Sequence, residues 1–502
     1  MNKVKQKLTA FLHSRNFPAA VLVAIVVAAV VFLNIIVYSL TAFFELYLYS
    51  PAKDDLSITD AADALFADAI ADGLKVTVTF CMYEDDVEAH TTGKFVHETA
   101  KEFAKKYPEF ISVEYINVKT KLDSELKSVE DKLAVWSKDS AISNASVVFE
   151  CGSNYRVVTD IYTSVGYADF FTLDSSYNIT SYNGEEVFAS MCAWVLSEDH
   201  GTAYFTIGHG ETSNSTFYNL LICAGYNVKE LNLRAATNTG VPEDADIVII
   251  SNPISDFERA AAGSGISAEI EKLTSYAEGG GNFLVTLDPY AKELPMLYDF
   301  LAGFGIGFDR TADGERQIVK DSNNAITTDG FTLVAEYADD EIARAMHEKI
   351  EKFGGRVILR DVASLALSGN AKPLLTASSS AVCQASGATT DTDGAYTIAA
   401  YSVQDNGVKG ESKLVFVPSV FLTATDAMIT NGYSNKDFLY SLFDVFYEHG
   451  TVPYGCRSIL YDNSMLENLT MGTARIYTAL MLAVPAVLAV VGCVLVVRRK
   501  NR

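Results

Sequence analysis

The chain has 502 residues and a formal net charge of −24, and 49% of its residues are hydrophobic. Such an acidic surface is a poor match for nucleic acid, which we exclude as a partner. The hydrophobic content excludes a disordered chain. Roughly 430 residues lie between two apolar end segments, enough for about three domains.

The first apolar segment is residues 17–40, FPAAVLVAIVVAAVVFLNIIVYSL, which carries no charge. Crossing a bilayer takes about 20 such residues, so the segment predicts a transmembrane helix. Residues 1–16 precede it and are basic. A cleaved signal peptide is the alternative, but signal peptides have a shorter apolar region of about 7–15 residues.

The second apolar segment is residues 476–497, IYTALMLAVPAVLAVVGCVLVV, and the basic residues 498–502 follow it. Its proline does not exclude a span, because membrane helices tolerate proline. Both basic flanks lie at the chain ends, and the positive-inside rule puts both in the cytoplasm. The sequence therefore predicts a two-pass protein of the cell membrane, in contact with the lipid bilayer, with a large extracytoplasmic domain.

Residues 55–180 resemble a thioredoxin-like α/β domain in outline. LKVTVTF at 74–80 and ISVEYINV at 111–118 are predicted strands, and the segment between them has helical spacing. Cys81 ends the first strand without a partner cysteine, so we predict no redox chemistry. Six scattered cysteines lie between the membrane segments, and we expect most of them to be buried free thiols.

Residues 185–450 are predicted to form an α/β domain with an insertion near 310–395. A helix at 185–198 leads into the strand TAYFTI, and the GHGE sequence at 208–211 follows it. Thr212 or Ser213 is the predicted cap of the next helix. Further strands are YNVKELNL, DADIVIIS and NFLVTLDP, with a helix ending in GGG before the last. This alternation predicts a doubly wound parallel sheet. Residues 376–394 are rich in Ser, Thr, Ala and Gly and are predicted to be a loop or insertion.

Ligands of doubly wound sheets bind outside the carboxyl ends of the strands. Three strand ends are polar here, and they supply the predicted ligand-binding residues His209, Glu211, Asn252 and Asp288. His209 and Glu211 could also form a catalytic pair, but nothing in the sequence indicates a substrate pocket. A polar turn is the third interpretation of GHGE.

Other chemistries lack their motifs. There is no H-E-x-x-H array for a metal, no G-x-S-x-G nucleophile and no G-x-x-x-x-G-K-[ST] phosphate loop. Cys223 falls within a helix rather than on a strand-to-helix turn. We therefore predict no catalytic residue, no metal site and no cofactor, and the chain cannot be the ATPase of a transporter.

The ordered blocks from YNGEEVFASMCAWVLSEDHGTAYFTIGHGE to FLVTLDP resemble the GldG-like auxiliary components of ABC transport systems. One part of the family motif matches Gly184, Glu185 and Glu186. The other matches Gly208, His209, Gly210 and Glu211. LSITDAADAL, after the first apolar segment, also resembles the family's lead into its N-terminal domain.

The resemblance implies a glutamine-amidotransferase-like fold without the catalytic cysteine. It also implies a non-enzymatic auxiliary subunit that acts beside an ABC-2-type permease and a separate ATP-binding subunit. The family was first linked to gliding motility, a role we do not extend to this chain. A binding module for cell-surface glycan or peptide is the alternative, and a membrane-anchored hydrolase is a third.

Overall fold

The computed structural model describes residues 56–460, except 120–122, 139, 162–168, 174–177, 213, 261–267, 386–387, 390–393 and 450–451. By its contacts the chain divides into residues 1–55 and residues 56–502, and all that follows concerns the second unit. Both predicted membrane segments, 17–40 and 476–497, and the basic ends lie outside the described residues. Within the described ranges, no helix has the length and apolar character needed to span a membrane.

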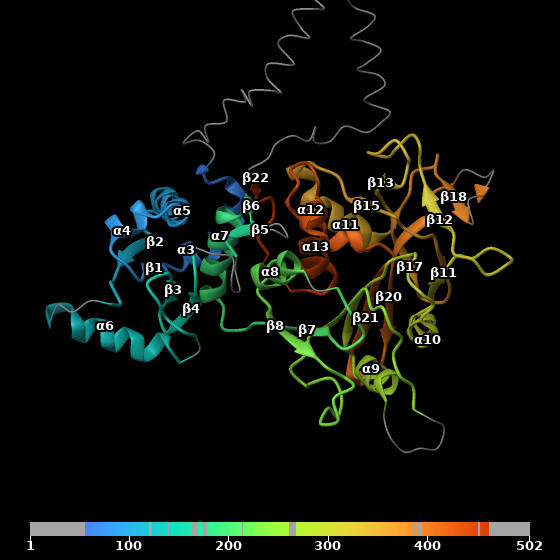
Figure 1. Ribbon diagram of the computed structural model, residues 1–502, viewed down its shortest axis with the longest axis horizontal. Helices are drawn as coiled ribbons and strands as arrows, with labels where there is room; N and C mark the ends of the chain where they lie inside the picture. Colours follow the sequence, from blue (N-terminus) through green and yellow to red (C-terminus); the bar gives the residue numbers. More distant parts are fainter. Residues whose placement is uncertain are drawn as a thin grey trace, which may run out of the picture. The chain divides into compact units, whose positions relative to one another are not determined.

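The N-terminal part of the described chain is an α/β layer around a four-stranded sheet of order β2-β1-β3-β4 (Figure 1). β1 and β2 are parallel and are connected through α4 and α5, as predicted. The antiparallel β3 and β4 complete the sheet. The elements are η2 Asp60–Ala62, α3 Asp63–Ala71, β1 Val76–Phe80, α4 Glu84–Ala89, α5 Gly93–Lys106, β2 Ile111–Tyr115, α6 Asp123–Trp136, β3 Val147–Cys151 and β4 Asn154–Val158.

Helix α7 Gly184–Leu196 joins this layer to the rest of the chain. Phe188 of α7 stacks on Phe103 of α5, with ring centroids 4.4 Å apart, and meets Phe149 of β3 edge-on. Beside the start of α7, two strands that precede the helix pair with the last strand of the described chain in a small sheet of order β22-β6-β5. The strands are β5 Phe171–Leu173, β6 Ile179–Tyr182 and β22 Ile459–Leu460. One continuous apolar core therefore runs past the predicted boundary at 180–185.

An eight-stranded sheet forms the centre of the second part, with the order β14-β17-β20-β21-β10-β9-β7-β8. The five strands from β21 to β8 are parallel, as predicted. The other three pair antiparallel, so the sheet as a whole is mixed. The prediction of a doubly wound parallel sheet thus holds for these five strands. β20 and β21 pair antiparallel because a short hairpin joins them. The strands are β7 Thr202–Thr206, β8 Asn227–Leu231, β9 Ile247–Ser251, β10 Asn282–Thr286, β14 Glu336–Tyr337, β17 Lys372–Thr376, β20 Thr397–Asp405 and β21 Glu411–Val417.

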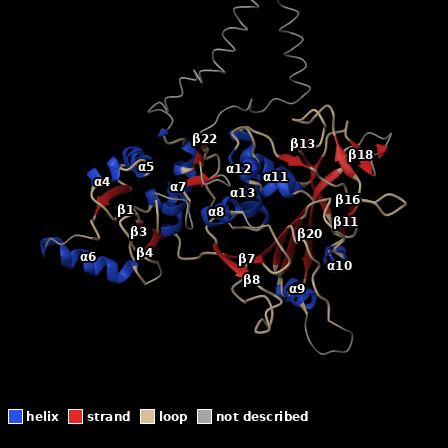
Figure 2. Ribbon diagram, in the orientation of Figure 1, coloured by secondary structure: helices blue, strands red, loops and turns tan. Residues whose placement is uncertain are grey.

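Helices cover both faces of this sheet (Figure 2). Strand side chains alternate between faces, so Ile249 and Leu284 join the core under α8 and α13, while Val248 and Val285 join the core under α9 and α10. β9 is buried along its whole length, as its unbroken apolar run predicts. The helices are α8 Ser215–Cys223, α9 Glu269–Glu278, α10 Pro295–Gly303, α11 Glu341–Ile350, α12 Thr425–Ile429 and α13 Asn435–Ser441, which continues as a π-helical turn over Leu442–Phe446.

The cap of α8 differs from the prediction. Asn214 is the N-cap, and its side chain accepts a hydrogen bond from the backbone N–H of Phe217. Thr212 instead bonds back to Ser251 through its own backbone, which holds it outside the helix. Ser213 lies outside the described residues. Gly225 ends the helix with φ of 89°, as predicted.

Part of the segment predicted as a loop at 376–394 is strand. Val382–Ala385 (β18) pairs with β12 Ile318–Lys320 and with β19 Ala388–Thr389, and Cys383 is buried there. Pairing with a distant strand overrides the loop-like composition. The remaining elements of this region are β11 Ile306–Phe308, β13 Thr332–Val334, η3 Glu351–Phe353, β15 Ile358–Arg360, β16 Leu365–Leu367, η4 Gly407–Lys409 and η5 Val420–Thr423.

Cys81, Cys192, Cys223 and Cys456 are buried free thiols, and Cys151 is a half-buried one. Cys383 is also buried. The prediction of buried free thiols is confirmed for the first four residues, and Cys81 has no disulfide partner.

Candidate functional site

The GHGE loop leaves the carboxyl end of β7 and turns sharply over its two glycines. Gly208 and Gly210 have φ of 113° and 75°, conformations that residues with a Cβ rarely adopt. Between them His209 turns inward, and its side chain is only 1% exposed. The glycines thus serve the turn, and the histidine enters the interior.

His209 lies between two carboxylates. Its Nδ1 is 3.1 Å from Glu211 Oε1, and its Nε2 is 3.0 Å from Glu269 Oε2. Both glutamate side chains are also buried, at 7% and 3% exposed. Glu269 stands in the first turn of α9 and accepts a further hydrogen bond from the backbone N–H of Glu258 at 2.8 Å. The three residues form a buried ion triad, which is the name we keep for Glu211, His209 and Glu269.

The charges of the triad follow from this geometry. Burial alone would lower the pKa of His209, but its bonds to the two carboxylates outweigh burial and raise the pKa to about 9. In turn, burial would raise the pKa values of Glu211 and Glu269, and the bonds from His209 bring both below the ordinary value. An imidazolium between two carboxylates is therefore the resting state at neutral pH.

The triad is closed on its remaining sides. The ring of Phe257 stacks on His209 with the centroids 4.1 Å apart. The carbonyl of His209 accepts hydrogen bonds from the backbone N–H groups of Ile254 and Ser255. A general base needs a free lone pair within reach of a substrate, and both nitrogens of this histidine are engaged. The arrangement favours a structural role for His209 and Glu211 over the predicted catalytic pair or direct ligand contact.

Asn252 and Asp288 lie apart from the triad but connect the same strand ends. Asn252 has φ of 49°. Its side chain donates to Thr212 Oγ1 at 3.1 Å and accepts from the backbone N–H of Asp288 at 2.9 Å. The ends of β7, β9 and β10 therefore meet at one edge of the sheet, as the sequence predicts. His209 and Glu211 belong to the buried ion triad, and Asn252 and Asp288 lie outside it. Ligand binding by these four residues stays a prediction.

Residues 184–186, the other part of the predicted GldG-like resemblance, begin α7. A side chain at Gly184 would collide with the ring of Tyr182, so the position requires glycine. Glu185 accepts hydrogen bonds from the backbone N–H and the hydroxyl of Thr59, both at 2.7 Å. Glu186 accepts from Lys436 Nζ at 2.9 Å and from the Tyr440 hydroxyl at 2.5 Å. Adjacent glutamates thus fasten two segments that are far apart in the sequence.

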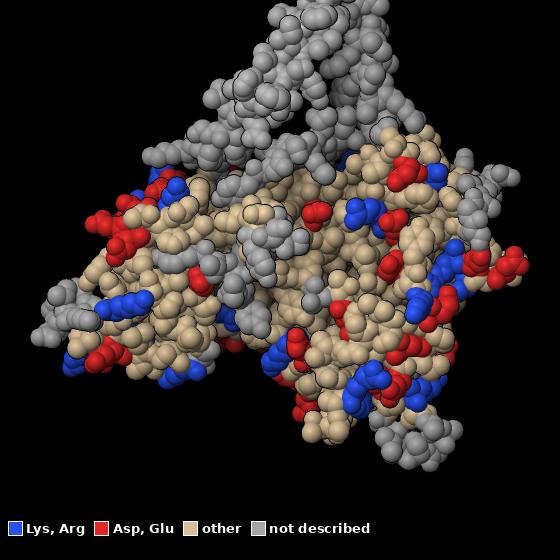
Figure 3. Space-filling view, viewed as in Figure 1, with Lys and Arg blue, Asp and Glu red and all other residues tan. Residues whose placement is uncertain are grey.

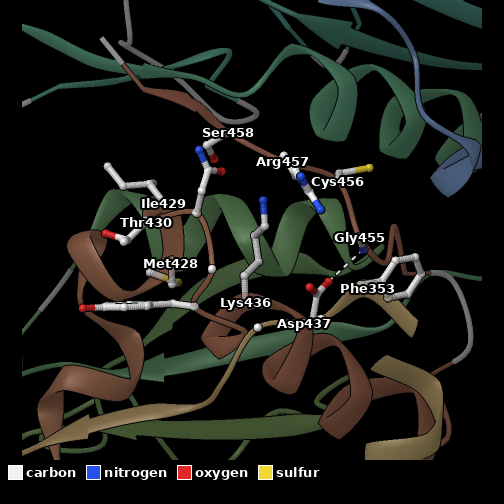
Figure 4. Close-up of a pocket in the computed structure, with 15 residues that line it drawn as sticks. Phe353, Met428, Ile429, Thr430, Lys436, Asp437, Gly455, Cys456, Arg457 and Ser458 are labelled. Carbon is white, nitrogen blue, oxygen red and sulfur yellow. Dashed lines mark hydrogen bonds between the residues drawn. The ribbon is translucent and has the colours of Figure 1, made fainter. Parts of the chain in front are cut away.

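A pocket of about 310 Å³ opens beside the Glu186–Lys436 pair. Figure 4 shows Lys436 reaching into it from α13 and Arg457 reaching into it from the segment after Gly455. Asp437 lies between them and accepts from the backbone N–H of Gly455 at 2.8 Å. In the described part of the chain no acidic side chain forms an ion pair with Arg457. The pocket therefore presents a buried ammonium, an exposed guanidinium and a half-buried carboxyl group to any molecule that enters.

Burial and neighbouring charges shift the pKa values of the ionisable side chains that line this pocket. Burial would lower the pKa of Lys436, but the charge of Glu186 dominates and raises it. Burial raises the pKa of Asp437, against the hydrogen bond from Gly455. The Cys456 thiol also has its pKa raised far above the ordinary value by burial, which makes it a poor nucleophile. Sequence reasoning missed this pocket, although a Lys-Asp pair in the first turn of an otherwise apolar helix was a usable signal.

Comparisons with known proteins do not identify a family for this chain. No family model matches the chain, and no curated protein matches it. Among solved structures, it is similar to the mmIFT52 N-terminal domain, with 17% identity and a TM-score of 0.36 over 49% of this chain and 97% of that one. It is also similar to PurLQS from Thermotoga maritima, with 11% identity and a TM-score of 0.27 over 49% of this chain and 100% of that one. A cytoplasmic protein of Salmonella typhimurium gives 10% identity and a TM-score of 0.30 over 49% of this chain and 98% of that one.

Proposed function

We propose that the chain is a non-enzymatic, membrane-anchored auxiliary subunit of an ABC-2-type transporter that works with a separate permease and ATPase. The observation that carries this proposal is that the two ends of the described chain meet at the start of α7. Thr59 is bound by Glu185, and Ile459 pairs with Tyr182, two residues before α7 begins. In Figure 1, β22 and β6 lie beside α7. A large domain held by two anchors in one membrane needs its ends close together.

The permease and the ATPase are proposed as partners from the resemblance to GldG-like proteins. The matched residue Glu185 holds one end of the described chain through Thr59, and the adjacent Glu186 holds α13 through Lys436. The family also suggests the finer classification, a thioredoxin-like layer followed by a glutamine-amidotransferase-like domain. Burial of Cys223 inside α8, which raises the pKa of its thiol, agrees with a domain that lacks the amidotransferase nucleophile.

A pull-down from membranes in mild detergent, followed by mass spectrometry, tests the proposal. A permease and an ATP-binding subunit are expected to co-purify with the tagged chain. An unrelated two-pass protein with the same tag and expression level is the control. Recovery of the intact chain without either subunit would refute the transporter role.

The pocket at Lys436 favours a second candidate, a binding module for an extracytoplasmic glycan or peptide. Arg457 is exposed and lines the pocket, so Arg457→Ala is expected to lose binding of an acidic glycan or peptide without unfolding the protein. Lys409→Ala, an exposed cation on the β20–β21 hairpin, is the matched control. A hydrolase remains the weakest candidate, because it would need His209 or Glu211 to leave the buried ion triad.

A further inference from the structure

A second histidine between two glutamates lies in the N-terminal layer. Glu84 and Glu88 are one turn apart on α4, and His97 faces them from α5. One ligand atom from each of the three lies within 4.8 Å of the other two. Figure 3 shows acidic side chains gathered over α4. We call these three residues the α4–α5 cluster.

The hydrogen bond between His97 and Tyr115 limits where the imidazole proton lies. His97 is fully buried, and its Nε2 lies 2.5 Å from the Tyr115 hydroxyl. That hydroxyl has one proton, which it donates either to Nε2 or to Glu84 Oε1 at 3.4 Å. In the second case Nε2 donates to the tyrosine oxygen, and this tautomer leaves on Nδ1 the lone pair that a metal ion would need.

The lone pair on Nδ1 has no complement in the described chain. Nδ1 makes no hydrogen bond, and Glu88 Oε1 lies 3.7 Å from it. A lone pair facing a carboxylate is repulsive unless a cation lies between them. Lys101 does not fill this position, because it donates to Glu88 and Glu98 from the surface, with its side chain 43% exposed.

We propose that the α4–α5 cluster binds a divalent first-row metal ion of the Zn²⁺ class through His97 Nδ1 and the carboxylates of Glu84 and Glu88. Imidazole nitrogen with carboxylate oxygen suits such ions, whereas Mg²⁺ and Ca²⁺ prefer oxygen alone. The two glutamates are 49% and 46% exposed, which leaves an entry path and room for water in the remaining coordination positions. Tyr115 acts as a positioning residue that fixes the tautomer of His97. The metal would fasten α4 to α5.

The test is a Zn²⁺ titration of the full-length chain, purified in mild detergent and stripped with a chelator. Calorimetry and metal analysis are expected to find Zn²⁺ bound at this cluster in the wild type. The double variant Glu84→Gln/Glu88→Gln is expected to bind at this site at least about 100-fold more weakly. Both positions are half exposed, so the variant keeps its fold. Glu102→Gln/Glu109→Gln removes the same charge from α5 and the turn after it, and should bind as the wild type does.

Two single variants separate a metal site from a surface charge effect. Tyr115→Phe is expected to weaken Zn²⁺ binding by about 10- to 100-fold while leaving the charge unchanged. Lys101→Met removes a nearby positive charge and is expected to strengthen binding by about tenfold. Absence of Zn²⁺ uptake by the wild type, equal uptake by the two double variants, or equal affinity for Mg²⁺ would each overturn the proposal.

Discussion

Two histidines of this protein each lie between two glutamates, and their surroundings give them opposite characters. His209 has carboxylates that are 7% and 3% exposed, hydrogen bonds at both ring nitrogens, and a pKa raised to about 9. His97 has carboxylates that are 49% and 46% exposed, one unpartnered nitrogen, and a lowered pKa. The comparison teaches that residue identity alone does not separate a structural ion triad from a metal site. Burial of the acids and the hydrogen-bond partner of each nitrogen decide between them.

The largest expected effect comes from removing the histidine of the buried ion triad. His209→Ala leaves Glu211 and Glu269 buried without their cation, and breaking a buried pair costs about 3–5 kcal/mol. Urea unfolding should show a loss of this size in the free energy of unfolding. Arg234→Ala, which removes an exposed ion pair with Glu258 beside the same loop, is the control and should change stability little. Similar effects of both variants would mean that the triad is not what stabilises the loop.

The raised pKa of His209 should make the free energy of unfolding depend on pH. Its folded pKa of about 9 exceeds the unfolded value near 6.5, so the folded protein binds the extra proton between them. This contribution, about 3 kcal/mol, is complete below about pH 6.5 and is lost as the pH rises through about 9. The charged groups around the His209 ring are Glu211 and Glu269, which face it, and the Arg234–Glu258 ion pair beyond them. Unfolding at several pH values should show the decline in the wild type, and His209→Gln should lack it.

Replacing one acid in each site sharpens the comparison. Glu269→Gln removes a buried charge that holds His209 and should cost about 2 kcal/mol. Glu88→Gln removes a half-exposed charge and should cost less than about 1 kcal/mol in metal-free protein. Thermal or urea unfolding in chelator measures both. If Glu88→Gln lost more stability than Glu269→Gln, the α4–α5 cluster would be the structural site and the buried ion triad would not.

The smallest expected effect is that of Tyr115→Phe in metal-free protein. The variant loses one hydrogen bond to His97 and one to Glu84, and should lower the free energy of unfolding by about 1 kcal/mol. Adding Zn²⁺ should stabilise the wild type more than the variant, which thermal unfolding with and without Zn²⁺ would reveal. Equal stabilisation of the two proteins would mean that Tyr115 does not position His97.

The parts that were predictable from sequence are those set by local pattern. Alternating strands and helices located β7, β9 and β10, and parallel pairing then required their polar ends to meet at one edge, where Asn252 connects them. The resemblance to GldG-like proteins also pointed to Glu185 and Glu186, which make long-range contacts at the start of α7. These features are predictable because the periodicity of strands and helices depends on residues that are neighbours in the sequence.

The remaining features depend on residues that are distant in the sequence. Glu269 completes the triad from 60 residues away, and nothing near His209 indicates it. Likewise, the ion pair of Lys436 with Glu186 spans 250 residues. The Glu84, Glu88 and His97 spacing matches no metal motif, because the two ligating helices meet only after folding. The antiparallel pairing of β20 with β21 was not predictable either, because the direction of a strand depends on the connection that leads to it and not on its own residues.

The meeting of both ends of the described chain at α7 has a mechanical consequence. A pulling force applied through the two ends would be borne by the bonds of Glu185 to Thr59 and by the short β22–β6 pair. The eight-stranded sheet lies outside that load path and would carry no tension. Under such a force the start of α7 would yield first, while the interior of the sheet stayed intact.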